Sequence, residues 1–151
     1  MSINITPDLL HGWTVLVVED ELDSLMIAEG LLSRAGADVL VAQNGAEGVA
    51  LAKRHRPRFI VSDLSMPVMN GWQMHEALKS DLATVDIPVI ALTAHAMSGD
   101  REKAISAGFH NYLTKPLMPY TFVKDVINLI MDVPELADLL FQQQQERANR
   151  G

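Results

Sequence analysis

Carboxylates stand directly after two short apolar runs of this sequence. Trp13 to Val18 leads into Glu19 and Asp20, and Arg58 to Ser62 leads into Asp63. If the two runs are neighbouring parallel strands, the three acids meet at one edge of a sheet. Two like charges about 4 Å apart repel by about 4 kcal/mol at an effective dielectric of about 20, so the cluster predicts a bound cation. The hard divalent ion Mg²⁺ takes one or two carboxylates together with waters and phosphate oxygens, which indicates phosphoryl chemistry.

A hydroxyl and an amine follow two further apolar runs. Thr93 comes after Ile87 to Leu92, and Lys115 comes after Asn111 to Thr114. In a phosphoryl-transfer site, Asp63 is the candidate nucleophile. The lysine amine and the metal ion would neutralise the equatorial oxygens, and the threonine hydroxyl would donate a hydrogen bond to one of them.

The apolar runs alternate with amphipathic stretches, which predicts five strand–helix units feeding a parallel sheet. The expected strands are residues 13–18, 38–42, 58–62, 87–92 and 111–114. The expected helices are residues 22–35, the stretch from Asn44 to before Pro57, 72–79, the stretch from Ser98 or Gly99 to Gly108, and 119–131. Right-handed crossovers then favour an α/β fold, a doubly wound (βα)5 sheet in the order 2-1-3-4-5.

One domain accounts for most of the chain. We expect an N-terminal extension over residues 1–12, the (βα)5 domain over 13–132, and a short C-terminal helix followed by a polar tail over 133–151. Leu136, Leu139 and Leu140 share one face of that helix. We expect this face to pack on its own domain, and packing on a partner or on a second copy in a homodimer stays open.

Composition excludes several classes of protein. A net charge of −7 argues against direct nucleic-acid binding, which needs a basic face, and the absence of cysteine excludes disulfides and thiolate metal sites. No apolar run reaches the roughly 20 residues of a membrane span, and the first residues lack the pattern of a secretory signal, so we expect a soluble cytoplasmic protein without membrane partners. The five histidines lack zinc-ligand spacing, and the glycines form no nucleotide-binding motif.

The strand-end residues, taken with their flanking sequence, resemble the receiver domain of two-component response regulators, of the stand-alone type with a flavodoxin-like fold. The resemblance covers about residues 14–131. The matching pieces are VLVVEDE (15–21), IVSDLSMPVMNG (60–71), VIALTAHA (89–96), AGFHNYLTKP (107–116) and the closing helix of the domain.

The resemblance implies a role for each residue of the site. Asp63 would be phosphorylated by a sensor histidine kinase or a histidine phosphotransfer protein, with Mg²⁺ as cofactor. Asp20 and Asp63 would ligate the metal directly, Glu19 largely through water, and the Ser65 backbone carbonyl would complete the site. Lys115 would be the lysine that contacts the phosphoryl group.

The resemblance also implies a switch. Thr93 would move toward the phosphoryl group and Tyr112 would rotate inward, which changes the surface of the fourth helix, fifth strand and fifth helix for a downstream protein partner. His95 and Ser65 would tune the lifetime of the phosphoaspartate, and the peptide bond before Pro116 would be cis. Packing at the sheet edge for Tyr112 and a solvated loop position for His95 are the alternatives.

Three other functions share parts of this pattern. In a phosphorelay intermediate, Asp63 passes its phosphoryl group to another histidine. A small aspartate-nucleophile phosphatase of the haloacid dehalogenase type would want an Asp where this chain has Ser65. A flavin binder would share the fold, but the carboxylates would repel its phosphate. We therefore expect a phosphoacceptor switch rather than an enzyme, with self-catalysed phosphotransfer and autodephosphorylation within its cycle.

Overall fold

The computed structural model describes residues 6–94 and 100–150. A five-stranded parallel sheet in the order β2-β1-β3-β4-β5 forms its centre, which confirms the predicted fold class and strand order. The strands are β1 (Thr14–Val18), β2 (Asp38–Ala42), β3 (Phe59–Asp63), β4 (Val89–Thr93) and β5 (Asn111–Thr114).

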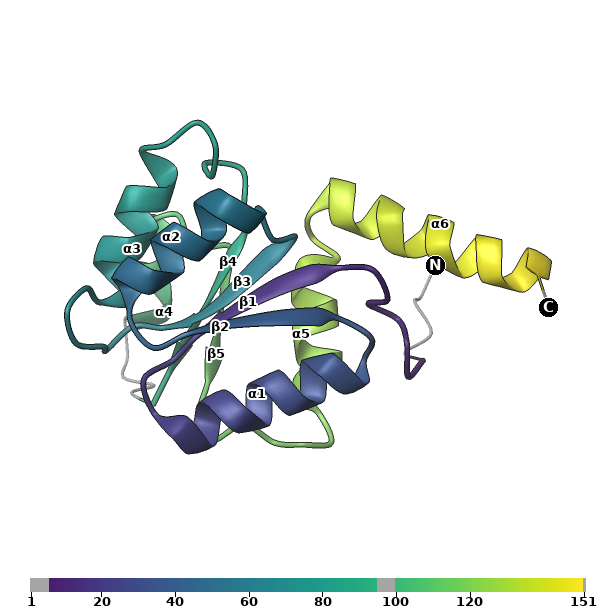
Figure 1. Ribbon diagram of the computed structural model, residues 1–151, viewed down its shortest axis with the longest axis horizontal. Helices are drawn as coiled ribbons and strands as arrows, with labels where there is room; N and C mark the ends of the chain where they lie inside the picture. Colours follow the sequence, from purple (N-terminus) through teal and green to yellow (C-terminus); the bar gives the residue numbers. More distant parts are fainter. Residues whose placement is uncertain (1–5, 95–99, 151) are drawn as a thin grey trace.

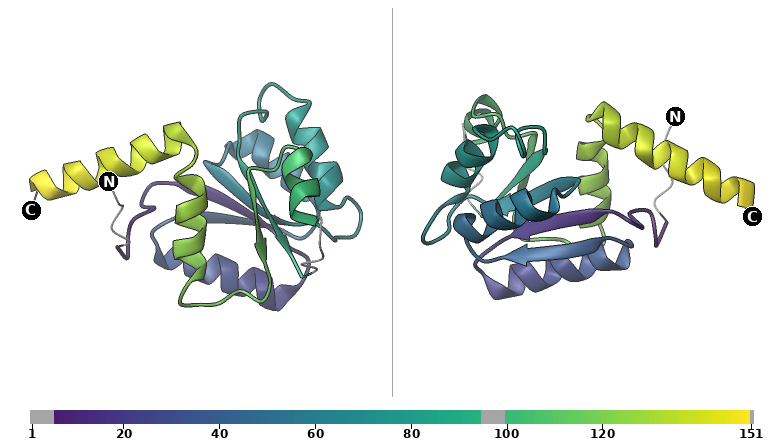
Figure 2. Two further views of the ribbon diagram at one scale, coloured as in Figure 1. Left: turned by 180° about the vertical axis from the view of Figure 1, so that it is seen from behind. Right: turned by 45° about the horizontal axis from the view of Figure 1, so that its top comes forward.

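Helices cover both faces of the sheet (Figure 1). The helices α1 (Leu22–Arg34) and α5 (Phe122–Ile130) lie on one face. The helices α2 (Gly45–His55), α3 (Gly71–Lys79) and α4 (Asp100–Ser106) lie on the other. A sixth helix, α6 (Pro134–Arg150), extends away from the sheet as an arm, as all three views show (Figures 1 and 2).

The central strands are apolar along their whole length because both faces of the sheet are covered. Along β1, Val15 and Val17 belong to the core shared with α1 and α5, whereas Leu16 and Val18 belong to the core shared with α2 and α3. All four side chains are fully buried. Burying one such side chain contributes about 1.5–3 kcal/mol, so these cores hold the strand ends at fixed positions.

Local sequence signals mark the start of α2 and the end of α1, whereas α5 begins at Phe122, later than the expected residue 119. The Asn44 side chain accepts a hydrogen bond from the Glu47 backbone N–H at 2.9 Å and so caps α2. Gly36 follows α1 with φ of 100°, which a residue with a side chain rarely adopts. The Lys115–Pro116 bond is cis, as expected.

The C-terminal segment differs from the expectation of a short helix with a polar tail, because α6 continues through the glutamine run to Arg150. Leu136 and Leu140 are buried against the N-terminal residues Leu9 and Leu10 and the rest of that core. The polar part of α6 is held by an ion pair between Arg147 and Asp8 and by further contacts with the same N-terminal segment. Glutamine, glutamate and arginine are also good helix formers, which favours the longer helix.

No helix in the described ranges combines the length and apolar character needed to cross a membrane. His95 and the expected helix start at Ser98 or Gly99 lie outside the described residues.

Candidate functional site

The sheet register brings the strand-end residues together. Asp63 is the last residue of β3, which lies between β1 and β4. Val18 pairs with Ser62, so Glu19 and Asp20 leave the sheet next to Asp63. Leu92 pairs with Asp63, so Thr93 is the next residue outward on the other side. The sequence therefore predicts correctly that these residues share one edge.

The Asp63 carboxylate is held by the backbone that follows it. The Asp63 side chain is 9% exposed. Its Oδ1 accepts hydrogen bonds from the backbone N–H groups of Leu64 at 2.7 Å and Ser65 at 3.3 Å. These two hydrogen bonds hold the carboxylate in one orientation at the end of β3.

Lys115 links the two buried acids of the site. Its Nζ lies 3.3 Å from Asp63 Oδ2 and forms an ion pair with Glu19 Oε1. Glu19 is fully buried, and its other oxygen accepts a hydrogen bond from the Glu21 backbone N–H at 3.3 Å. One cation thus bridges two carboxylates that would otherwise repel each other across the end of β1 and β3.

Burial and charge perturb both partners of this pair. Burial raises the pKa of Glu19 above its usual range, and the neighbouring Asp63 raises it further, while Lys115 opposes the shift. Burial alone lowers the pKa of Lys115, but the hydrogen bond with Glu19 and the charges of Asp63 and Glu19 outweigh it, so the net change is upward. The site therefore favours added positive charge, because the carboxylates outnumber the lysine.

The carboxylates have the chemistry of a site for a hard divalent cation. Glu19, Asp20 and Asp63 each offer one oxygen, and these oxygens lie within 4.8 Å of one another. Asp20 is exposed while the other two are buried, so the cluster opens to solvent on the side of Asp20. All donors are oxygens, which Mg²⁺ prefers, and an open side leaves room for waters and phosphate oxygens.

The loop after Asp63 passes very close to the strand end. A Cβ at Gly71 would lie 2.2 Å from the Asp63 backbone oxygen and 2.9 Å from Leu64 Cα. The Gly71 N–H donates to the Leu64 carbonyl at 3.0 Å, which closes the loop onto the site. Only glycine fits at this position, because any side chain would push the backbone that carries Asp63.

The remaining predicted residues lie in different surroundings. Thr93 is buried, with its backbone carbonyl accepting from the Lys115 N–H at 2.8 Å. Tyr112 lies on β5 opposite Ala91 and packs partly buried against the core shared with α2 and α3. Ser65 is exposed in the turn directly after Asp63. His95 lies outside the described residues.

Two features of the site are not predictable from residue spacing. Glu19 pairs directly with Lys115, although 96 positions of sequence numbering separate them and only the closed sheet brings β1 and β5 ends within reach. The close approach at Gly71 is the second, and the Pro/Gly turn in the sequence was its only signal.

Known proteins match this chain in sequence. Residues 15–127 match the family model described as the response regulator receiver domain. The polar-differentiation response regulator DivK of Brucella anthropi is 33% identical over 119 residues, which cover 79% of this chain and 97% of that protein.

Solved structures agree in fold. The chemotaxis response regulator CheY4 of Vibrio cholerae matches with a TM-score of 0.72 at 28% identity, over 78% of this chain and 98% of that one. The receiver domain of the sensor histidine kinase PA1611 from Pseudomonas aeruginosa PAO1 matches with a TM-score of 0.71 at 31% identity, over 79% and 98%. That structure has a magnesium ion coordinated in its active site cleft. The site geometry, the strand order and these matches together lead to one conclusion: the chain belongs to the response regulator receiver domain family.

Proposed function

We propose that Asp63 is the phosphoacceptor of this receiver domain and takes a phosphoryl group from a sensor histidine kinase or a histidine phosphotransfer protein. The observation that carries this proposal is the setting of the Asp63 carboxylate. It is fixed by two backbone N–H groups, faced by Lys115 at 3.3 Å, and grouped with two further acids. A rigidly held carboxylate beside a cation is suited to attack on phosphorus.

The transfer step moves one phosphoryl group without any other reactant. A carboxylate oxygen of Asp63 forms a bond to phosphorus, and the bond between phosphorus and the donor histidine nitrogen breaks, with its electron pair returning to the imidazole. Lys115 shifts from pairing with Glu19 and Asp63 to neutralising the phosphoryl oxygens, and the Thr93 hydroxyl donates to one of them. Mg²⁺, held by Asp20, Asp63, the Ser65 carbonyl and, through water, Glu19, would supply charge neutralisation when bound.

The same event would act as a switch. Thr93 and Tyr112 lie on neighbouring strands, β4 and β5, and α4 packs beside β5. Movement of Thr93 toward the phosphoryl group and of Tyr112 inward would alter the surface formed by α4, β5 and α5. On that surface Ile105 is 44% exposed and offers an apolar contact to a downstream protein partner. Reversing a two-state equilibrium from 1:99 to 99:1 requires about 5.5 kcal/mol of differential contact energy.

Phosphorylation with acetyl phosphate, followed on Phos-tag gels, tests this function. We expect Mg²⁺-dependent labelling of the natural chain and none of Asp63→Asn. Lys115→Ala should be labelled more slowly than the natural chain, because its amine no longer neutralises the phosphoryl oxygens during transfer. Labelling of Asp63→Asn at the natural rate would refute the assignment.

A phosphorelay intermediate is the second candidate function. In that role Asp63 returns its phosphoryl group to a phosphotransfer protein, and back-transfer in a purified mixture separates the relay from a terminal switch. A phosphatase of the aspartate-nucleophile class is less well supported. The position two residues after Asp63 holds Ser65, whose exposed hydroxyl is a far weaker acid than the carboxyl that class places there.

The lifetime of the phosphoaspartate depends on how water approaches it. We propose that Ser65, exposed beside the carboxylate, and His95 tune this step. An unchanged phosphoaspartate lifetime in His95→Ala would show that His95 does not tune this step.

A further inference from the structure

The end of α2 carries an unusual concentration of positive charge. Residues 53–58 read KRHRPR and hold four of the 12 lysines and arginines of a chain whose net charge is −7. Lys53, Arg54 and His55 occupy the last turn of α2, where cations stabilise the helix dipole. Arg56 is the C-cap residue of α2 and shares this setting, whereas Arg58 lies two residues further on, so the helix dipole does not account for Arg58.

The two arginines are exposed and available for a ligand. Lys53 pairs with Asp81 at 3.2 Å. Within the residues that the structure describes, Arg54, Arg56 and Arg58 form no ion pair, and all three are exposed. Arg56 has φ of 47°, a left-handed conformation that is uncommon for a residue with a side chain.

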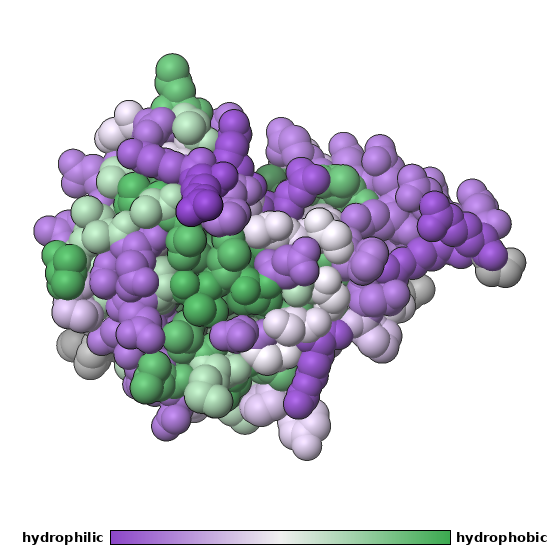
Figure 3. Space-filling model, viewed as in Figure 1, coloured by the Kyte–Doolittle hydropathy of each residue, from purple (hydrophilic) through white to green (hydrophobic). Residues whose placement is uncertain are grey.

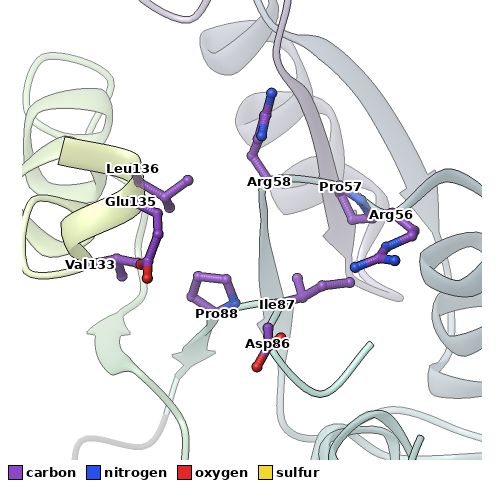
Figure 4. A pocket seen from close by; sticks show the side chains of 9 residues that line it. All are labelled: Arg56, Pro57, Arg58, Asp86, Ile87, Pro88, Val133, Glu135 and Leu136. Carbon is purple, nitrogen blue, oxygen red and sulfur yellow. The ribbon is translucent and has the colours of Figure 1, made fainter. Parts of the chain in front are cut away.

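Arg56 and Arg58 line a cavity of about 560 Å³, which is within the usual range for binding pockets. Figure 4 shows α6 residues on one side of it, the two arginines on the other, and Ile87 and Pro88 between them. Figure 3 shows strongly hydrophilic surface beside the notch where α6 leaves the body. Arg56 and Arg58 therefore border an apolar wall formed by Ile87, Pro88 and Leu136, and in Figure 4 their guanidinium groups point in different directions.

We propose that this cavity docks a short acidic segment of a partner protein, with carboxylates on Arg56 and Arg58 and an apolar side chain against Ile87, Pro88 and Leu136. Arginine binds carboxylates in a bidentate manner. The apolar wall is complementary to an apolar side chain, which a peptide can supply and a nucleic-acid backbone lacks. Asp86 and Glu135 also border the cavity and balance the two arginines, so a segment whose few carboxylates sit directly on the guanidinium groups suits the cavity better than a long polyanion. The net charge of −7 of the whole chain also repels a long polyanion.

The docking site lies at the opposite end of β3 from the phosphoacceptor. Arg58 directly precedes the strand and Asp63 ends it, and at about 3.3 Å per residue the two are separated by about 16 Å. None of the elements of the proposed output surface lines the cavity. The partner is therefore held in the same way before and after phosphorylation, as a tether rather than a readout.

Fluorescence anisotropy with the full chain and a labelled peptide, Glu-Glu-Leu-Glu-Leu-Glu, tests the proposal. We expect saturable binding that weakens with added salt, a loss of at least about tenfold in affinity in Arg56→Ala/Arg58→Ala, and a partial loss in Arg56→Lys/Arg58→Lys. Arg34→Ala/Arg101→Ala removes the same charge from exposed positions elsewhere and should bind as the natural chain does. Melting curves of each variant check that the fold is intact.

Three results would overturn the proposal. The first is no saturable binding of the peptide, and the second is an equal loss of affinity in both double alanine variants. The third is stronger Arg56- and Arg58-dependent binding of a single-stranded oligonucleotide or of phosphatidylglycerol vesicles, which would assign the site to phosphate groups. Treatment with acetyl phosphate and Mg²⁺ should leave the peptide affinity within twofold, and a larger change would contradict the tether.

Discussion

Gly71→Ala tests whether the loop after β3 fixes the phosphoacceptor. The added Cβ would meet the Asp63 backbone oxygen at 2.2 Å, whereas ordinary van der Waals contacts begin at 3.4 Å. The backbone carrying Asp63 must therefore move by about 1 Å, and overpacking of this kind costs about 1–3 kcal/mol. For a chain of this length we expect the melting temperature to fall by about 2–12 °C. A misplacement of about 1 Å in a reacting group costs about 100-fold in rate, so phosphorylation by acetyl phosphate should slow by about that factor.

Gly30→Ala is the matched control. Gly30 lies within α1, and a Cβ there would meet no atom within 4 Å. The same substitution should stabilise the protein by about 0.5–1 kcal/mol, through helix propensity, and leave phosphorylation unchanged. Differential scanning calorimetry and Phos-tag time courses measure both quantities. If Gly71→Ala melts and reacts as the natural chain does, the loop does not position Asp63 and the reasoning from the close approach is wrong.

Three further outcomes follow from the site and the core. Mg²⁺ at about 100 times its Kd should stabilise the fold by about 2.7 kcal/mol, seen as a higher melting temperature, and Asp20→Ala should lose this response; an equal shift in the variant would contradict the metal site. Burial is the larger cause, and the charge of Lys79 the smaller one, that lowers the pKa of His75 below its usual value of 6.5. The unfolded chain therefore binds a proton at His75 more readily than the folded chain does. Stability should fall as the pH drops below 6.5, by up to about 1.4 kcal/mol per pH unit, and His75→Phe should remove this slope in urea titrations at several pH values. Leu140→Ala empties a fully buried position of α6 and should cost about 2–5 kcal/mol in the same titrations, whereas no loss would mean that α6 does not share the core.

The sheet and the grouping of the site were predictable from the sequence because both depend on short-range patterns. Continuous apolar runs such as Leu16 to Val18 indicate a strand covered on both faces, and the strand order then places Glu19, Asp20 and Asp63 at one edge. The residues that end these strands could be identified without knowledge of tertiary contacts. The fold class, the strand order and the sheet edge that carries the site all follow from the hydrophobic periodicity and from the handedness of the crossover connections.

Contacts between distant segments were not predictable in the same way. Arg147 near the end of α6 pairs with Asp8, and residue types alone do not reveal a partner 139 positions away. The direct ion pair between Glu19 and Lys115 depends on where the ends of β1 and β5 lie relative to each other. The expected role of Glu19, contact with the metal through water, does not predict this pair. The cavity beside Arg56 and Arg58 exists only because the start of α6 lies over the start of β3 and β4.

Direct mapping of the phosphoryl group tests the central claim. The protein is treated with acetyl phosphate and Mg²⁺, the acyl phosphate is trapped by borohydride reduction, and the modified residue is located by peptide mass spectrometry. We expect one modified position, Asp63, and no modification without Mg²⁺. Modification at Asp20, Glu19 or Ser65 in place of Asp63 would contradict it.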